Sequence, residues 1–250
     1  TQYGYGLGKG ADEGKIPEGV RKILVADVVL KSSGTTFSAL GERWRTNLIG
    51  AFNVYNAAAA ISVGLAEGVS VETMKAALQE ARSVPGRLEQ VECGQDFTVI
   101  VDYAHEPASL EAAYAAAKLF RPKRIIAVLG AQGGGRDVWK REAMGKIAAE
   151  RCDTVILTNE DPYDENPLEI IRGVEKGVRA AGKKTELYRI VDREEAIEKA
   201  ISFARTGDAV VLTGKGGEVW MCVSGGRKVP WDERAVAESA GLRRVGGRIV

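Results

Sequence analysis

Residues 84–89, Val-Pro-Gly-Arg-Leu-Glu, open a stretch of the chain that ends in Asp-Tyr-Ala-His-Glu-Pro at residues 102–107. Between these two strings, residues 88–93 and 97–103 carry apolar, β-branched and aromatic side chains at strand-like spacing. The turn-forming string Gly-Gln-Asp at residues 94–96 separates them. Two short strands joined by a tight turn have this pattern, so we expect a β-hairpin here.

The second strand of this hairpin leads directly into a helix. Pro107 suits the first position of a helix, and residues 108–119 are almost all helix formers. Asp102 and His105 therefore lie at the carboxyl end of a strand and just before a helix, where open α/β sheets bind ligands. Two other readings stay open: Asp102 caps the following turn, and His105, the only histidine, is a surface group.

From residue 88 onward, strand patterns and helix patterns alternate along the chain. Short apolar runs precede longer helical segments that begin at Asp, Pro or Arg. This alternation is typical of a parallel sheet with helices on both faces. We expect strands at 124–129, 154–158, 186–190 and 208–213, helices at 137–151, 167–181 and 193–206, a hairpin within 219–229 and a last helix at 232–240, followed by a loose end at 241–250.

The first third of the chain has a different organisation. Residues 1–19 are rich in Gly and charge and predict a loop. Small apolar residues fill a helix that opens within 48–68, and Ser70 is placed to cap a second helix at 71–81. Ser-Val-Pro-Gly at 83–86 breaks the pattern, which predicts two domains, 1–83 and 84–250. The remaining elements expected here are two strands, at 23–30 and 35–40.

Asn53 and Asn56 share one face near the start of the first helix, because they are three residues apart. A carboxamide offers both a donor and an acceptor, which suits the edge of a purine. The same side chains are also common helix caps, and the residues alone favour capping over binding.

Three loops of the predicted parallel sheet contain residue types that bind ligands. Gly130–Asp137 offers glycine amides and the cation Arg136, which suit a carboxylate or a phosphate, and a flexible turn is the other reading. Asn159–Pro167 holds four carboxylates that bind a metal or an amino group, or only solvate a helix start. Gly214-Lys-Gly-Gly-Glu218 is the third loop. It lacks the spacing of a P-loop, and no P-loop occurs elsewhere in the 250 residues.

Composition excludes several classes of protein. With 35 basic and 34 acidic residues, the net charge of +1 gives no field that would attract a nucleic acid or an anionic membrane. The three cysteines lie far apart in the sequence, which fits free thiols in a reducing cytoplasm and no structural zinc site. No apolar run reaches membrane-spanning length. The chain begins with Thr1, so we expect it to start within a longer reading frame or after processing.

These strings together resemble the Mur ligase family over residues 47–242. Pro-Gly-Arg-Leu-Glu followed by Asp-Tyr-Ala-His-x-Pro is similar to the start of the third domain of these enzymes. Gly-x-Phe-Asn-x-x-Asn at 50–56 resembles the end of their central ATPase domain. Gly-Lys-Gly-x-Glu at 214–218 matches as well, with Gly217 where the family has His. The branch that adds the third amino acid to a UDP-N-acetylmuramoyl dipeptide is the best match.

The resemblance implies a fold and a partial site. Residues 84–250 would form a Rossmann-like, mostly parallel sheet with helices on both faces, and residues 1–83 a fragment of the central ATPase domain. It implies no catalytic residue and no metal ligand in this chain. Nucleotide contacts would come from Asn53, Asn56, Arg87, Asp102 and His105, and amino-acid contacts from Arg136, Glu160, Asp161, Pro162, Tyr163, Gly214 and Glu218.

The loop at 160–163 departs from the family pattern. Family members that add meso-diaminopimelate usually show Asp-Asn-Pro-Arg, whose Arg binds the distal carboxylate, whereas this chain has Glu-Asp-Pro-Tyr. Without that bidentate cation, Tyr163 and the nearby acids favour L-lysine or another amino acid that lacks a distal carboxylate.

The function implied is an ATP-dependent amide ligase of peptidoglycan synthesis that works through an acyl phosphate. ATP and Mg²⁺ would be the cofactors, bound mostly by other domains of the same protein, and the substrates would be a UDP-N-acetylmuramoyl dipeptide and a free amino acid. We expect a cytoplasmic location and no activity from the chain alone. Two alternatives stay open: a non-catalytic module that binds amino acids or nucleotides, and another ligase of the superfamily, such as a folylpolyglutamate or cyanophycin synthetase.

Overall fold

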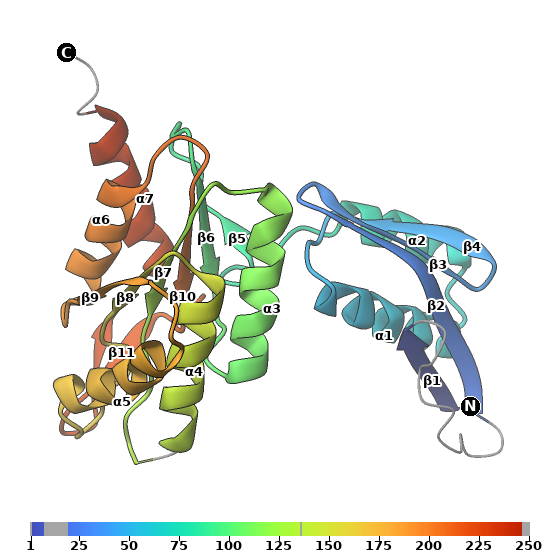
Figure 1. Cartoon of the computed structure of the whole chain (residues 1–250). Coiled ribbons are helices and arrows are strands. Elements are labelled where there is room, and N and C mark those ends of the chain that lie inside the picture. The colour runs from blue at the N-terminus through green and yellow to red at the C-terminus, as the bar shows by residue number, and fades with distance from the viewer. Residues whose placement is uncertain (1, 8–19, 136, 247–250) are drawn as a thin grey trace. The chain divides into compact units, whose positions relative to one another are not determined.

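The computed structural model describes residues 2–7, 20–135 and 137–246. The chain divides into two compact units, residues 1–83 and residues 84–250 (Figure 1). Each unit has its own sheet, its own helices and its own core.

The first unit contains a four-stranded sheet and two helices. The sheet order is β1-β2-β3-β4, with β1 parallel to β2 and the other pairs antiparallel. Two strands were not expected, β1 and β4. Strand β1 lies in the segment for which a loop was predicted, and residues 8–19 of that segment lie outside the described part. The elements are β1 (Gln2–Leu7), β2 (Val20–Lys31), β3 (Gly34–Ala39), β4 (Glu42–Thr46), α1 (Phe52–Ala66) and α2 (Val71–Glu80).

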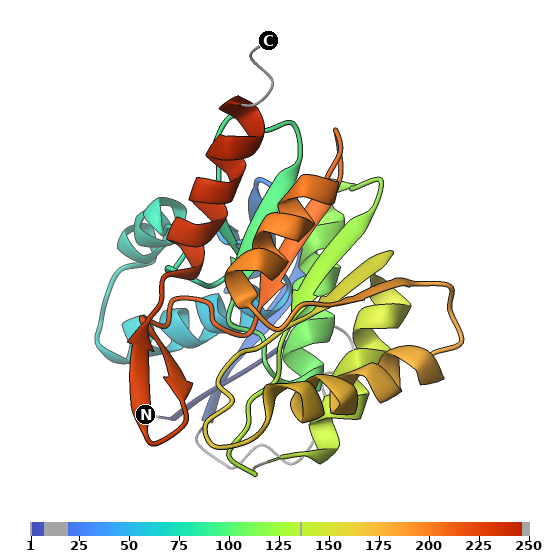
Figure 2. The ribbon, with the colours of Figure 1, turned by 90° about the vertical axis from the view of Figure 1, so that its left-hand side faces the viewer.

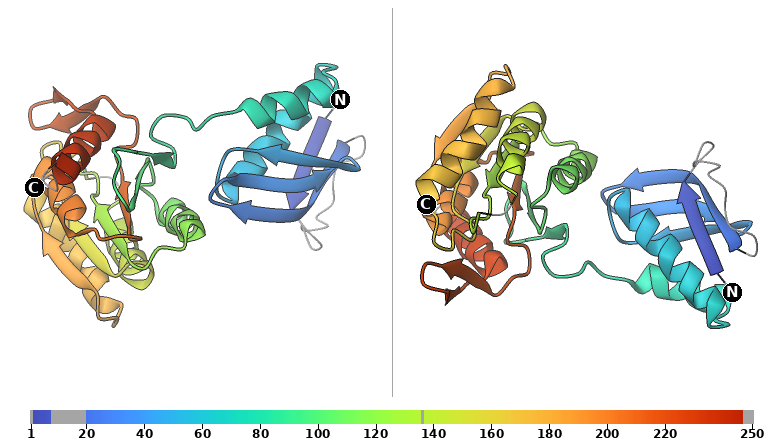
Figure 3. Two further views of the ribbon diagram at one scale, coloured as in Figure 1. Left: turned by 90° about the horizontal axis from the view of Figure 1, so that it is seen from above. Right: turned by 90° about the horizontal axis from the view of Figure 1, so that it is seen from below.

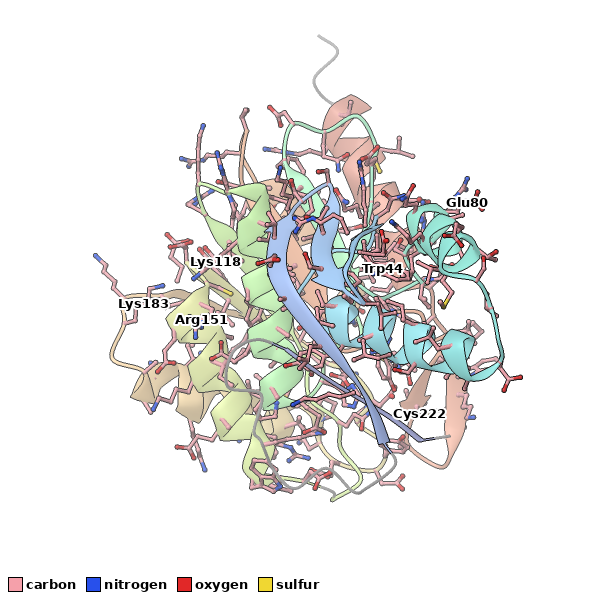
Figure 4. All side chains as sticks on the ribbon, turned by 90° about the vertical axis from the view of Figure 1, so that its right-hand side faces the viewer. Trp44, Glu80, Lys118, Arg151, Lys183 and Cys222 are labelled. Carbon is pink, nitrogen blue, oxygen red and sulfur yellow. The ribbon has the colours of Figure 1, made fainter. Side chains whose placement is uncertain are left out.

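Trp44 on β4 forms the centre of the first core (Figure 4). Its side chain is fully buried, stacks on Phe37 with 6.4 Å between ring centroids, and donates a hydrogen bond from Nε1 to the carbonyl of Ala39 at 2.8 Å. Strand β4 alternates exposed and buried residues because only one face of the sheet meets α1 and α2. Ser70 caps α2 as expected, since its Oγ accepts a hydrogen bond from the amide of Thr73.

The second unit is built on a six-stranded sheet of order β5-β6-β10-β7-β8-β9. Strand β5 pairs antiparallel with β6, and all other neighbours are parallel. The predicted α/β fold with a mostly parallel sheet is therefore confirmed. The strands are β5 (Glu89–Gln90), β6 (Thr98–Asp102), β7 (Ile125–Leu129), β8 (Thr154–Leu157), β9 (Glu186–Arg189) and β10 (Ala209–Thr213).

Helices cover both faces of this sheet. Helices α6 and α7 lie in front of the strands in Figure 2, with α3 behind them, and Figure 3 shows the same layers from above and below. Strands β7 and β10 are buried along their whole length, as their continuous apolar sequences require. The helices are α3 (Pro107–Ala117), α4 (Trp139–Arg151), α5 (Pro167–Ala180), α6 (Arg193–Phe203) and α7 (Glu233–Gly246), and a short 3₁₀ turn, η1, spans Lys118–Phe120.

Helix α7 continues past the predicted end at residue 240. Gly241 was taken as the start of a loose segment, but it is buried where α7 crosses Cys93, and a Cβ at this position would lie 3.1 Å from Cys93 Sγ. The glycine therefore permits close packing within the helix. Residues 247–250 lie outside the described part.

The predicted hairpin near residue 220 is confirmed as the two-stranded sheet β11 (Trp220–Val223) and β12 (Arg227–Pro230). Of the helices described, none is both long enough and apolar enough to cross a bilayer.

Candidate functional site

Four neighbouring parallel strands, β6, β10, β7 and β8, end at the same edge of the sheet. The loops that follow them surround a cavity of about 500 Å³. The loops after β7, β8 and β10, which carry predicted site residues, all reach this edge, and so does the segment after β6. The side chains that line the cavity include Tyr103, His105, Lys140, Asp161, Tyr163 and Glu218.

Asp102, at the end of β6, is 6% exposed, and its carboxylate accepts hydrogen bonds from backbone amides. One carboxylate oxygen accepts a hydrogen bond from the amide of Leu88 and the other from the amide of Ala104, each at 2.8 Å. Burial raises the pKa of Asp102, against the lowering effect of these amides and of Arg87. Asp102 thus fastens the segment that carries Arg87 to the end of β6, which agrees with the turn-capping reading left open above.

Arg87 and His105 both pack against the ring of Tyr103. The guanidinium of Arg87 lies 4.4 Å from the ring centroid of Tyr103, and the ring of His105 meets the same tyrosine edge-on at 4.6 Å. Tyr103 donates its hydroxyl proton to Glu218 Oε1 at 3.0 Å. Burial and the bond to Glu218 raise the pKa of Tyr103 to about 12, so the hydroxyl stays protonated at neutral pH and keeps a proton to donate to Glu218.

Two glycine contacts hold the Arg87 segment against the loop after β10. Gly86 has a φ of +70°, and a Cβ there would lie 1.8 Å from the amide nitrogen of Gly217. A Cβ on Gly216 would lie 2.7 Å from Cβ of Tyr103. Only glycine fits at these positions, because the two loops touch backbone to backbone.

Lys215 is the centre of the site, and the sequence prediction assigned it no role. Its side chain is fully buried, and its ammonium lies 2.9 Å from Asp161 Oδ1 and 2.6 Å from Glu218 Oε2. Burial lowers the pKa of Lys215, but its bonds to the two carboxylates outweigh burial and raise the pKa, so the lysine stays charged. The signal in the sequence was a lysine between glycines directly after an apolar strand.

Glu160 lies beneath the loops and is fully buried. Neither of its carboxylate oxygens has a hydrogen-bond partner among the described residues. Burial raises its pKa to about 7, although the cations Arg193 and Lys215 lower it. A Cβ on Gly214 would lie 2.4 Å from Glu160 Oε2, so the glycine makes room for this carboxyl group.

The reading that these acids only solvate a helix start is wrong for Glu160 and Asp161, because both are buried. The cap of α5 is Asn166, whose Oδ1 accepts a hydrogen bond from the amide of Leu168 at 2.9 Å. Pro162 is buried as well.

The glycines of the loop after β7 form hydrogen bonds and close contacts with the loop after β8. Gly133 donates its amide hydrogen to the carbonyl of Asp161 at 2.8 Å, and a Cβ on Gly133 would collide with the carbonyl oxygen of Pro162. Gly135 donates its amide to Glu165, which also pairs with Arg141 at 2.9 Å. Burial raises the pKa of Glu165, but these two donors outweigh it and the net shift is downward. Arg136, the expected carboxylate-binding cation, lies outside the described residues.

Asn53 and Asn56 belong to the first unit and are described on their own. Asn53 donates from Nδ2 to the carbonyl of Ile49 at 2.8 Å, and Asn56 donates from Nδ2 to Asn53 Oδ1 at 2.9 Å. Neither caps α1, whose N-cap is Ala51, without a side-chain bond. The capping reading is therefore wrong, and the exposed Asn56 stays a candidate for nucleotide binding.

Comparison with known proteins identifies the family. The sequence profile described as "Mur ligase, glutamate ligase domain" matches residues 86–216, more than half of the chain. The chain belongs to the Mur ligase family. The match covers the segment of Arg87 and ends within the loop of Lys215, so it contains all four strand ends of the cavity.

Two curated relatives are about 45% identical to this chain over the matched residues. A protein of Geobacillus kaustophilus named "UDP-N-acetylmuramoyl-L-alanyl-D-glutamate--2,6-diaminopimelate ligase" is 45% identical over 196 residues, which are 78% of this chain and 39% of that protein. A "UDP-N-acetylmuramyl-tripeptide synthetase" of Roseiflexus sp. is 44% identical over 198 residues, 78% of this chain and 38% of that protein. The chain thus spans well under half of the length of these relatives.

Solved structures of Mur ligases have the same fold. A structure of a UDP-N-acetylmuramoyl-L-alanyl-D-glutamate diaminopimelate ligase has a TM-score of 0.62 at 29% identity and covers 89% of this chain and 46% of that one. MurF from Acinetobacter baumannii has a TM-score of 0.65 at 16% identity over 96% of this chain and 51% of that one. At this lower identity the likeness shows the fold alone.

Proposed function

We propose that this chain forms the amino-acid-binding part of an ATP-dependent ligase that adds the third residue to UDP-N-acetylmuramoyl-L-alanyl-D-glutamate in peptidoglycan synthesis. The observation that carries the proposal is the cavity at the ends of β6, β10, β7 and β8, in which Lys215 holds Asp161 and Glu218 in fixed positions. The names of relatives at 44–45% identity support the same reaction.

In this proposal the two units have separate tasks. Residues 1–83 form the end of the central ATPase domain, and residues 84–250 form the domain that brings the amino acid to the activated carboxylate. Amide formation needs an activated carboxylate, and an acyl phosphate made from ATP supplies it. Closing a domain over that group aligns the amine and excludes water.

The residues near the Arg87 segment would contact the nucleotide. The guanidinium of Arg87 is exposed, packs on the face of Tyr103, and has no carboxylate within 4 Å among the described residues, so its charge is available to a phosphate. Asp102 would act by holding this segment, and His105 by packing on Tyr103. Asn53 and Asn56 would contact the base from the first unit.

The cavity residues would bind the amino acid. Asp161 and Glu218 are acceptors for its ammonium group, held in place by Lys215, and Arg136 would bind its α-carboxylate. Glu160, Pro162 and Gly214, which were expected to contact the amino acid, are not among the residues that line the cavity. The described residues include no cluster of three or more His, Cys, Asp or Glu side chains that would hold a metal ion. In this proposal Mg²⁺ is bound mostly by other parts of the protein, as the family resemblance implies.

The test uses the full-length protein that contains this chain, in the cytoplasmic setting we expect for it. With ATP, Mg²⁺, the UDP-dipeptide and an amino acid, we expect a UDP-tripeptide and one phosphate per product. Arg87→Ala should raise the KM for ATP about tenfold or more, because a charge-assisted hydrogen bond contributes roughly 1.5–3 kcal/mol. Arg121→Ala, an exposed arginine in the turn before β7, serves as the control.

Three results would contradict the proposal. Ligation by residues 1–250 alone would show that the chain needs no other domain. Binding of an amino acid or a nucleotide without any ligation by the full-length protein would favour the non-catalytic module. Use of a folate or a cyanophycin primer in place of the UDP-dipeptide would favour another ligase of the superfamily.

A further inference from the structure

The β11–β12 hairpin is fastened to the loop that resembles the amino-acid selectivity motif. The amide of Cys222 donates to Asp161 Oδ1 at 2.8 Å, and the amide of Tyr163 donates to the carbonyl of Cys222 at 3.2 Å. At the tip of the hairpin, the amide of Gly225 donates to Asp164 Oδ1 at 2.9 Å. Three hydrogen bonds thus hold the hairpin against this loop. Figure 4 labels Cys222 on the hairpin.

The two faces of the hairpin look into different cavities. Cys222 lies directly opposite Lys228 in the antiparallel register, so their side chains share one face, together with Trp220 two residues before Cys222. These three side chains line the 500 Å³ cavity of the candidate site. Met221 and Val229, on the opposite face, line a separate cavity of about 790 Å³. Lys228 therefore belongs to the same cavity as Tyr163.

Lys228 differs from the other lysines near this cavity. Lys140 is 2.6 Å from Glu106 Oε1, and the buried Lys215 is held by two carboxylates. The ammonium of Lys228 lies 5.6 Å from the ring centroid of Trp220, and no carboxylate of the described residues lies within 4 Å of it. An exposed contact with an aromatic ring is worth only about 0.5–1 kcal/mol, so the lysine can turn to an anion at little cost.

We propose that Lys228 binds the distal carboxylate of the incoming amino acid. The inference rests on the proposed function and names the substrate class: an amino acid with a second carboxylate at its far end, of which meso-diaminopimelate is the example. The cation that the family usually carries at the position of Tyr163 is then supplied by Lys228 on β12. The prediction of L-lysine considered only Tyr163 and the nearby acids of its own loop, because the sequence does not reveal that the hairpin faces the same cavity.

The test compares the use of meso-diaminopimelate and of L-lysine by the full-length protein. Wild type should prefer meso-diaminopimelate, measured as the ratio of kcat/KM values. Lys228→Met should lower this ratio about tenfold or more through the KM for meso-diaminopimelate, since a lost charge-assisted bond is worth roughly 1.5–3 kcal/mol. Lys199→Met is the matched control, because Lys199 also packs on an aromatic ring, 4.7 Å from the centroid of Phe203 on α6.

A second variant separates charge from structure. Tyr163→Arg combined with Lys228→Met returns a cation to the same cavity and should restore most of the preference, which a merely structural role of Lys228 would not allow. An unchanged ratio in Lys228→Met, or a wild type that prefers L-lysine, would overturn this inference and leave the ligase function standing. No UDP-tripeptide from wild type with either amino acid would overturn the proposed function itself.

Discussion

The ammonium of Lys215 lies 2.9 Å from Oδ1 of Asp161, and both side chains are buried. Lys215 follows β10 and Asp161 follows β8, so this ion pair spans β7, the strand between them. The pair fixes the distance between two loops that the proposed reaction needs close together.

Lys215→Met should therefore destabilise the second unit strongly. Removing one partner of a buried ion pair costs about 3–5 kcal/mol, because the other charge stays buried without compensation. Urea denaturation measures the loss as a lower midpoint at an unchanged slope. The control is Arg172→Met, whose exposed pair with Glu169 should be worth less than about 1 kcal/mol. Equal losses in the two variants would contradict the assigned role of Lys215.

Gly86→Ala should weaken the contact between the Arg87 segment and the loop after β10. A methyl group there meets the backbone of Gly217 and also takes up an unfavourable positive φ. We expect a loss of about 2–4 kcal/mol, since overpacking adds about 1–3 kcal/mol to the cost of the strained backbone. Gly94→Ala is the control, because its φ is +80° and nothing lies within 4 Å. It should lose only the backbone part, and a loss as large as that of Gly86→Ala would argue against the loop contact.

Glu160 should make stability depend on pH. Burial raises the pKa of Glu160 from 4.5 to about 7, so the folded protein binds more protons than the unfolded chain between these values. The free energy of unfolding should fall as pH rises through this window, by roughly 3 kcal/mol at most, since one pKa unit is worth about 1.4 kcal/mol. The charged groups that influence the pKa of Glu160 are Arg193, Asp161, Lys215 and Lys140, and Tyr103 interacts with it as well.

Glu160→Gln keeps the shape and cannot titrate, so urea denaturation at a series of pH values should show this slope only in wild type. Glu165→Gln should keep it, because the pKa of Glu165 is lowered and its titration lies below the window. A wild type and a Glu160→Gln variant with the same pH profile would contradict the assignment.

Arg193→Met should release α7 from the sheet. Arg193 donates two hydrogen bonds to the buried Glu233, at 2.9 and 2.6 Å, and others to the carbonyls of Asn159 and Thr213. We expect a loss of about 3–5 kcal/mol for the single variant and a smaller loss for Arg193→Met with Glu233→Leu, because an apolar pair leaves no charge behind. A double-mutant cycle in urea measures the coupling, and additive losses would show that the two residues act independently.

The sequence predicted most elements and the edge at which the site lies. Alternation of strands and helices indicates a parallel sheet, and parallel strands bring their following loops to one edge. Strand β1 was missed because its glycines weaken the strand pattern, and β4 because its alternation is short and carries charged residues on the exposed face.

Other features needed the tertiary structure. Pairing of β10 with both β6 and β7 does not follow from alternation, which leaves the order of strands open. The burial of Lys215 and the shared cavity of Tyr163 and Lys228 depend on segments far apart in the chain. Gly86 was expected only as part of the domain boundary at 83–86, whereas the structure shows it packed against the backbone of Gly217.

The position of β10 has a consequence for how the protein assembles during synthesis. β6 and β7 are not hydrogen-bonded to each other, and each pairs with β10, which is the last of the six strands to be made. Until β10 has been made, β6 and β7 lack their shared native partner, and unpaired strand edges of this kind can pair with other chains. The cavity is therefore completed late in translation, when one inserted strand joins the two halves of the sheet.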